Sequence, residues 1–312
     1  DYDYTVTTPN HACMLTGRPV LQPAGQANVQ HGYFLNSPLD IENIQTYGNN
    51  PGVYKASTFD VVHDRGLSTA LYSAKLKFDF FVNSWDETYG APDQVGEDNG
   101  RNKIDFWMLQ NGSASLNGAS ELLVDSVIDS ITNAPRTYTF LHFAEPDYAG
   151  HSGGWGGAGY SNAVRHVDQQ LGRIFAALGS APALSNQFAL LLTADHGGGN
   201  PTNSHDVATS YKNYIIPMFI WEPGIPAGVD LYSLFANRHD PGTNRLDYNA
   251  PEQPLRNGDS GNLALALLGL PPVPGAWMLP ALQDAPTWPL LTKNSEGFTV
   301  ASGVRPCSDG YI

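Results

Sequence analysis

Apolar and polar positions alternate along the chain in blocks that predict strands and helices in turn. Apolar runs at residues 68–73, 138–143 and 188–193 are typical of buried strands, and the last of them reads as buried on both faces. Helical spacing of apolar positions marks four further segments, residues 58–65, 119–132, 160–178 and 263–270. Because strands and helices alternate, we expect an α/β fold in which a mainly parallel sheet carries helices on both faces.

The first twenty residues combine a short apolar segment with turn residues. Tyr4–Thr7 predicts a strand, and a helix is expected to begin at about Ala12. Asn10 suits the N-cap of this helix and Gly17 its C-terminal cap. The segment therefore predicts a strand, a turn and a helix in succession.

The middle and the later part of the chain contain less regular segments. Residues 83–118 are rich in Asn, Gly, Asp and Ser, which predicts a loop-rich insertion over one face of the sheet. Residues 214–221 predict another strand, broken by Pro217. We expect residues 1–312 to form a single α/β domain.

Charge and cysteine content narrow the possible functions. The 312 residues include 30 acidic and 16 basic side chains, for a net charge of −14, which disfavours binding to a nucleic-acid duplex. No run approaches the ~20 apolar residues that a membrane span needs. The two cysteines, Cys13 and Cys307, leave open one disulfide bond or two thiols. The first residue is not Met, so we expect a segment upstream of it.

Candidate metal ligands follow two of the predicted strands. Asp147 and His151 come after the strand at 138–143, and Asp195 and His196 come directly after the strand at 188–193, before three glycines. His205 follows ten residues after Asp195. Strand ends line the ligand-binding crevice of open α/β sheets, and mixed Asp and His donors suit Zn²⁺ or a similar divalent ion.

Each histidine has a structural interpretation beside the functional one. His142 within a strand, His166 within a helix and His63 near a helix end are expected to be structural. His239, in a loop, is the alternative metal ligand if His205 is not one. His11 is expected to support the site or the core rather than to bind a metal.

At these residues the chain resembles the alkaline phosphatase superfamily, and within it the type I phosphodiesterase and nucleotide pyrophosphatase branch. The branch carries Thr-x-Pro-Asn-His, then Thr-Gly, His-Gly and an Asn, and later Glu-Pro-Asp…Gly-His and Asp-His-Gly. The matching residues are, in order, Thr7 to His11, Thr16-Gly17, His31-Gly32, Asn36, Glu145 to Asp147, Gly150-His151 and Asp195 to Gly197. The resemblance covers residues 5 to about 270 and implies a three-layer sandwich of the alkaline phosphatase type.

The resemblance implies roles for three residues near the N-terminus. Thr7 would be the nucleophile, with Thr8 as the alternative if the turn is registered differently. Asn36 would donate a hydrogen bond to a phosphoryl oxygen. A covalent phospho- or nucleotidyl-threonine would form and then be hydrolysed.

The resemblance also implies two divalent metal ions, most often zinc. One ion would be held by Asp147, His151 and a later histidine. The other would be held by Asp195, His196, the nucleophile Thr7 and one further aspartate.

Two departures from the branch affect this assignment. In the phosphodiesterases, the later histidine that binds the first metal ion lies far downstream of Asp-His-Gly. Here the Gly-Asn-Pro-Thr…His205 arrangement is similar to that of phosphopentomutases, so we rank His205 above His239 as this metal ligand. The superfamily's first metal aspartate lies on a strand some tens of residues before the nucleophile. We therefore expect this strand to lie upstream of residue 1.

Other classes remain open within the same fold. A sulfatase needs a Cys/Ser-x-Pro-x-Arg motif, which the sequence around Cys13 lacks. A phosphomutase is compatible with the position of His205, but residues 83–118 form a small insertion for a cap domain. A non-catalytic binding relative is the alternative from another class.

The substrate is expected to be a small phosphate ester, either a diester, a monoester or a phosphonate. The usual location of the family's members, the acidic charge and the two cysteines favour a secreted or periplasmic protein. The sequence leaves the oligomeric state open.

Overall fold

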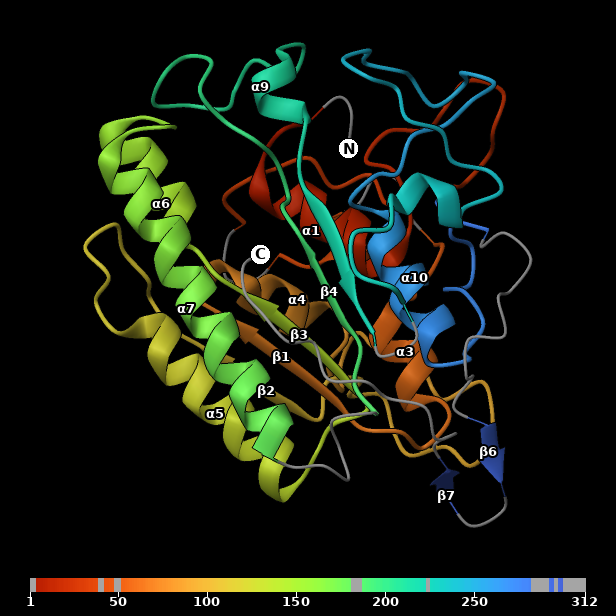
Figure 1. The fold of residues 1–312 in the computed structure, drawn as a ribbon. Helices are drawn as coiled ribbons and strands as arrows, with labels where there is room; N and C mark the ends of the chain where they lie inside the picture. Colours follow the sequence, from red (N-terminus) through yellow and green to blue (C-terminus); the bar gives the residue numbers. More distant parts are fainter. Residues whose placement is uncertain are drawn as a thin grey trace.

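The computed structural model describes residues 4–38, 42–47, 52–180, 187–222 and 225–281, together with the backbone of two short strands at 292–294 and 297–299. Helices and strands alternate along most of this length (Figure 1). The longer helices are α1 Thr7–Thr16, α3 Thr58–His63, α4 Asp79–Ser84, α5 Ala119–Asn133, α6 Glu145–Gly153, α7 Ala158–Ser180 and α10 Asp259–Leu267. The strands are β1 Thr69–Ser73, β2 Phe106–Leu109, β3 Tyr138–His142, β4 Leu190–Thr193, β5 Met218–Trp221, β6 Thr292–Asn294 and β7 Gly297–Thr299. Short helical turns complete the set, α2 Ile44–Tyr47, η1 Leu76–Phe78, α9 Tyr211–Tyr214 and η2 Leu231–Leu234.

Three parallel strands form the sheet on which the site is built. The order is β2-β1-β3, and β1 pairs with both neighbours, Ala70 opposite Phe106 on one side and opposite Thr139 on the other. All five residues of β1 are buried. A central strand that is covered on both faces is expected to be mostly apolar, and in the sequence TALYS the two polar residues stand at the ends, where their hydroxyl groups are hydrogen-bonded.

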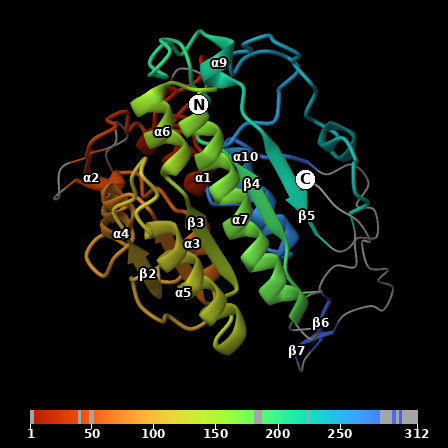
Figure 2. The ribbon, with the colours of Figure 1, turned by 60° about the vertical axis from the view of Figure 1, so that its left-hand side comes forward.

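Helices cover both faces of this sheet, so the structure confirms the predicted three-layer α/β architecture (Figure 2). Leu71 packs on one side, in a core shared with α1, α3 and α10. Ala70 and Tyr72 point to the other side, where α5 and α7 pack. This alternation follows from the period of two along a strand, which sends successive side chains to opposite faces.

The strand that carries Asp195 differs from the prediction in its partner and in its burial. β4 pairs antiparallel with β5, with Leu191 opposite Ile220, rather than with the parallel strands. Its four residues are only partly buried. An apolar run four residues long shows that a strand is present but carries no information on the direction of its partner.

The predicted strand at Tyr4–Thr7 is wrong, because α1 begins at Thr7 with Val6 as its N-cap. Pro9 lies in the first turn, where the missing N–H costs no hydrogen bond, so the helix starts before it rather than after Asn10. Gly17 ends the helix with φ +62°, as predicted. The correction moves Thr7 from a strand to the N-terminal end of a buried helix.

Several elements were not predicted, and two of them, β2 and α6, belong to the sheet and the site. β2 lies inside residues 83–118, so this segment contributes a strand to the sheet in addition to its loops. α6 forms from the glycine-containing segment that follows β3, with Pro146 in its first turn. Pro in a first turn favours helix formation even where glycines follow.

Two other predictions concern the membrane and the cysteines. No helix in the part of the chain that the structure describes is both long and apolar enough to cross a bilayer. Cys13 is buried with its Sγ 3.4 Å from Nε2 of His31. Cys307 lies outside the described residues, so its pairing stays a prediction.

Candidate metal and phosphoryl site

Five of the seven predicted site residues line one cavity of about 340 Å³ at the carboxyl end of the parallel sheet, and the other two, Asp195 and His196, line a second cavity of about 60 Å³. Segments far apart in sequence meet at the larger cavity, since Thr7, Asn36, Asp147, His151 and His205 all line it. Asp147 and His151 are four residues apart on α6 and therefore share one face of that helix.

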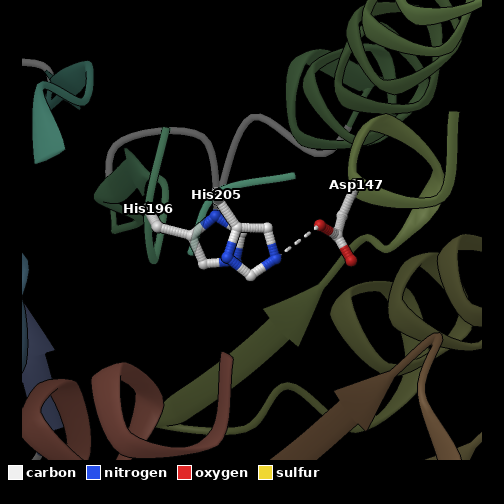
Figure 3. Close-up of side chains that lie close together, drawn as sticks. All are labelled: Asp147, His196 and His205. Atoms are coloured by element: carbon white, nitrogen blue, oxygen red, sulfur yellow. Dashed lines mark ion pairs between the residues drawn. The ribbon is translucent and has the colours of Figure 1, made fainter. Parts of the chain in front are cut away.

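Three acceptor atoms on two elements face one another in this cavity. His151 Nε2 lies 3.1 Å from His205 Nε2 and 3.4 Å from Asp147 Oδ1. His205 Nε2 lies 3.7 Å from the same carboxylate oxygen, the ion pair drawn in Figure 3. The three atoms are thus closer to one another than most unbonded polar atoms.

Backbone carbonyl groups fix the tautomer of each histidine in the cluster. His151 Nδ1 is 2.9 Å from the carbonyl of Asn203, and His205 Nδ1 contacts the carbonyl of Thr5. His196 Nδ1 lies 2.7 Å from the carbonyl of Gly197. A carbonyl only accepts hydrogen bonds, so each Nδ1 carries the proton and each Nε2 presents a lone pair.

Asp195 and His196 extend the cluster on the side of β4. The imidazole of His196 stacks on that of His205 with ring centroids 3.7 Å apart, and its Nε2 lies 3.4 Å from Asp195 Oδ2. Asp147, His196 and His205 can offer ligand atoms within 4.8 Å of one another (Figure 3). Among the described residues, the buried atoms Asp147 Oδ1 and His196 Nε2 have no hydrogen-bond partner.

Electrostatics keep these groups in the protonation states that metal binding requires. Burial lowers the pKa of His205 to about 4, against the opposite effect of Asp147. Burial alone would raise the pKa of Asp195, but His196 and His11 outweigh it and hold that pKa well below the usual range. At neutral pH the imidazole of His205 is therefore neutral and the carboxylate of Asp195 ionised.

Lys75, which was not among the predicted site residues, connects the candidate nucleophile to the cluster. It is only 6% exposed, and its Nζ donates to Thr7 Oγ1 at 3.2 Å and to Asp147 Oδ2 at 2.7 Å. Asp147 thus pairs one oxygen with a lysine and presents the other to the histidines. The position of Lys75 two residues after β1 was the signal in the sequence, since strand ends line the crevice.

Asn36 is held against the first turn of α1. Its side-chain oxygen accepts from the backbone N–H of Thr8 at 3.1 Å and from Lys77 Nζ at 2.9 Å, and its carbonyl accepts from the Thr8 hydroxyl. These contacts occupy the amide oxygen and leave the Nδ2–H₂ group as a donor toward the cavity. Burial, with Lys75 nearby, lowers the pKa of Lys77 to about 8.

The remaining histidines lie where the structural interpretation put them. His11 is buried, with Nδ1 2.8 Å from the Thr7 carbonyl and 3.6 Å from Asp195 Oδ2. His142 Nδ1 lies 2.9 Å from Ser73 Oγ. His239 is exposed and is not among the residues that converge with Asp147.

The fold and the cluster together define a class of protein, the alkaline-phosphatase-like α/β proteins with an Asp and His metal site at the strand ends. The sequence model of the type I phosphodiesterase / nucleotide pyrophosphatase family matches residues 3–216, more than half of the chain. The chain belongs to this family.

Individual proteins show more distant similarity. A 2,3-bisphosphoglycerate-independent phosphoglycerate mutase of Halobacterium salinarum is 35% identical over 91 residues, which are 28% of this chain and 16% of that protein. A phosphoglycerate mutase structure from Leishmania mexicana covers 70% of this chain and 39% of its own, at 15% identity and a TM-score of 0.41. The similarity to the structure of murine ectonucleotide pyrophosphatase / phosphodiesterase 5 covers 62% of this chain and 46% of the murine chain, at 20% identity and a TM-score of 0.38. The chain therefore spans less than half the length of each.

The residues present fit the metal that the superfamily implies. The Nε2 atoms of His151 and His205 converge on Oδ1 of Asp147, a carboxylate whose pKa, against the effect of burial, is lowered by Lys75, and a cation among these three atoms would be stabilised by all of them. Two carbonyl groups direct the Nε2 lone pairs inward, as in metal sites whose ligands are oriented by outer hydrogen bonds.

Proposed function

We propose that this chain hydrolyses small phosphate esters in the manner of a phosphodiesterase or nucleotide pyrophosphatase, with Thr7 as the nucleophile and two zinc-type divalent ions as cofactors. The observation that carries the proposal is the convergence of Asp147 Oδ1, His151 Nε2 and His205 Nε2 in the cavity that Thr7 also lines. Family membership supports the reaction class.

The donors divide into two sets. Asp147, His151 and His205 would hold one ion, and Asp195 and His196, with the Thr7 hydroxyl, would contribute to the second. When bound, the two ions supply positive charge that stabilises an alkoxide and the negative charge on a reacting phosphoryl group.

The position of Thr7 in its helix supports the proposed role as nucleophile. It is the first residue of α1, a buried helix of ten residues, so the N-terminal dipole end of the helix favours an anionic phosphoryl group beside it. Lys75 donates to Thr7 Oγ1 and so stabilises negative charge on that oxygen. In the proposed reaction Oγ1 loses its proton to water and forms a bond to phosphorus, while the bond from phosphorus to the leaving oxygen breaks and that oxygen takes up a proton from water. A second water then cleaves the bond between phosphorus and Oγ1, which restores the threonine hydroxyl.

Asn36 and Lys77 would bind the oxygens that do not react. The amide of Asn36 has its oxygen occupied, so its Nδ2–H₂ group is available to donate to a non-bridging oxygen. The cavity of about 340 Å³ suits a small ester.

One observation favours a second candidate, a monoester or phosphonate hydrolase. Lys75 and Lys77 both line the cavity, in a chain of net charge −14. Two ammonium groups compensate a dianionic phosphoryl group better than the single charge of a diester. Secretion or export to the periplasm, and action on a small molecule rather than a nucleic-acid duplex, remain part of the same proposal.

Hydrolysis assays test the proposed function. We expect the zinc-loaded chain to cleave bis-p-nitrophenyl phosphate, and chelation to abolish the cleavage. Faster cleavage of p-nitrophenyl phosphate would favour the second candidate, and cleavage of p-nitrophenyl sulfate alone would indicate a sulfatase. No cleavage of any ester by a chain that binds zinc would contradict the proposal.

A further inference from the structure

Two glycines beside the metal cluster make room for one indole ring. A Cβ placed on Gly198 would lie 2.0 Å from Trp155 Cε2, and one on Gly150 would lie 2.5 Å from the same atom. Neither glycine has a positive φ, so the backbone conformation does not require glycine at these positions. The ring of Trp155 is therefore what excludes a side chain there.

The indole lies edge-on against two of the candidate ligands. Its centroid is 5.2 Å from that of His151, at an interplanar angle of 81°, and 5.8 Å from that of His205, at 78°. One histidine belongs to α6 and the other to the loop after β4, so a single side chain touches ligands from two separate elements.

The backbone near Trp155 joins the same two elements. The Trp155 N–H donates to the carbonyl of Thr202 at 3.1 Å. Asn203 accepts from His151 Nδ1 through its carbonyl and donates from its side chain to the His151 carbonyl at 3.3 Å. The end of α6 and the loop that carries His205 are thus held together on both sides of the indole.

We propose that Trp155 is a positioning residue of the metal site, which sets the separation and the ring orientation of His151 and His205. This inference rests on the metal site in the proposed function. The indole packs against both imidazoles and fills the space between their elements, so truncating it lets the two ligands move independently.

The test compares zinc dissociation constants, measured by chelator competition, for the wild-type chain and its variants. We expect Trp155→Ala to weaken zinc binding by about ten- to hundredfold, the range found for residues that orient metal ligands. Trp155→Phe keeps an aromatic edge and should lose less. Trp107→Ala, on β2 and 51% exposed, is the matched control and should leave the constant unchanged.

A double-mutant cycle separates positioning from a general loss of packing. The three atoms nearest to a Cβ at Gly198 all belong to Trp155. Gly198→Ala alone should therefore weaken zinc binding, but it should add little in the Trp155→Ala background. Because Gly198→Ala retains the indole, it carries the test even if Trp155→Ala does not fold.

The outcomes are distinguishable. A Trp155→Ala chain that binds zinc within about threefold of the wild type, or additive effects in the cycle, would overturn the positioning role and leave the proposed function intact. A wild-type chain that binds no zinc would overturn the proposed function itself. Quenching of Trp155 fluorescence by bound Co²⁺, lost in Trp155→Phe, is the spectroscopic signature that we expect.

Discussion

Two regions of this molecule gather the same kinds of side chain, and only one of them has the properties of a metal site. Asp147, His196 and His205 converge at the strand ends, and His63, Asp64 and Asp93 converge beside the loop that precedes β2. Both groups combine histidine with aspartate, two histidines and one aspartate in the first and one histidine and two aspartates in the second.

The second group already contains its own cation. The ammonium group of Lys103, which is fully buried, donates to Asp64 Oδ1 at 3.1 Å, to the carbonyl of Gly100 at 3.0 Å and to Asp93. His63 Nδ1 lies 2.9 Å from Asp93 Oδ1, so it also donates to that carboxylate. The three hydrogens of the ammonium group thus have three acceptors.

The types of side chain alone therefore do not define a metal site. At the strand ends the imidazole N–H groups bind backbone carbonyls and direct lone pairs inward, whereas His63 directs its N–H at the carboxylate of Asp93. Lys75 reaches the first cluster but pairs with the outer oxygen of Asp147, which leaves Oδ1 exposed to the histidines. The tautomers and the position of the nearest lysine decide which cluster binds a cation.

The largest expected effect concerns Thr7, beside the cluster of Asp147, His196 and His205, which we call the open cluster. Thr7→Ala should reduce kcat for phosphate ester hydrolysis by at least about ten-thousandfold, because the nucleophile is lost. Circular dichroism should be unchanged. Thr8→Val is the control and should cost less, since the Thr8 hydroxyl only donates to the Asn36 carbonyl at 3.1 Å. A Thr8→Val enzyme without activity beside an active Thr7→Ala enzyme would transfer the role to Thr8.

Removing the Lys103 ammonium group tests the cluster of His63, Asp64 and Asp93, which we call the closed cluster. Lys103→Met should lower the free energy of unfolding by about 3–5 kcal/mol, because it removes the buried cation that pairs with the carboxylates of Asp64 and Asp93. Zinc content should not change. The exposed Lys212→Met control should stay within about 0.5 kcal/mol in urea unfolding. A Lys103→Met chain as stable as the wild type would break the comparison.

Removing a ligand tests the open cluster. His205→Ala should weaken zinc binding by about a hundredfold or more, because a direct ligand contributes at least as much as the residues that orient it. The exposed His239→Ala should bind zinc as the wild type does, by calorimetric titration. The reverse result would make His239 the third ligand and remove His205 from the site.

The smallest expected effect is a pH dependence from Lys77. Burial lowers its pKa to about 8, so the side chain is charged below that pH and neutral above it. KM for an anionic ester should rise by up to about tenfold between pH 7 and pH 9 as the positive charge is lost. Lys77→Arg should remove this rise, because the guanidinium group stays charged. A KM that is flat in both enzymes would place Lys77 outside the substrate site.

Sequence reasoning located the residues of the open cluster because each follows a strand. Asp147 follows β3 of the parallel sheet and Asp195 follows β4 of the antiparallel pair, and an apolar run precedes each of them. The helix that pairs Asp147 with His151 was missed, because glycines obscured its pattern although Pro146 suited its first turn. Local sequence therefore predicted where the ligands lie better than the element that carries them.

Tertiary partners account for the other differences. The burial of Lys75 depends on Asp147, 72 residues later, and no local pattern reveals such a partner. The antiparallel pairing of β4 with β5 likewise depends on the course of the chain between them. Residues 83–118 read as a loop because β2 is only four residues long and lies among polar residues.

Zinc-edge anomalous diffraction from crystals of the zinc-loaded chain is the most direct test of the central claim. The account predicts anomalous density among Asp147 Oδ1, His151 Nε2 and His205 Nε2, and no density at the Lys103 ammonium group. Density between His63, Asp64 and Asp93, or no density at the strand ends, would contradict it.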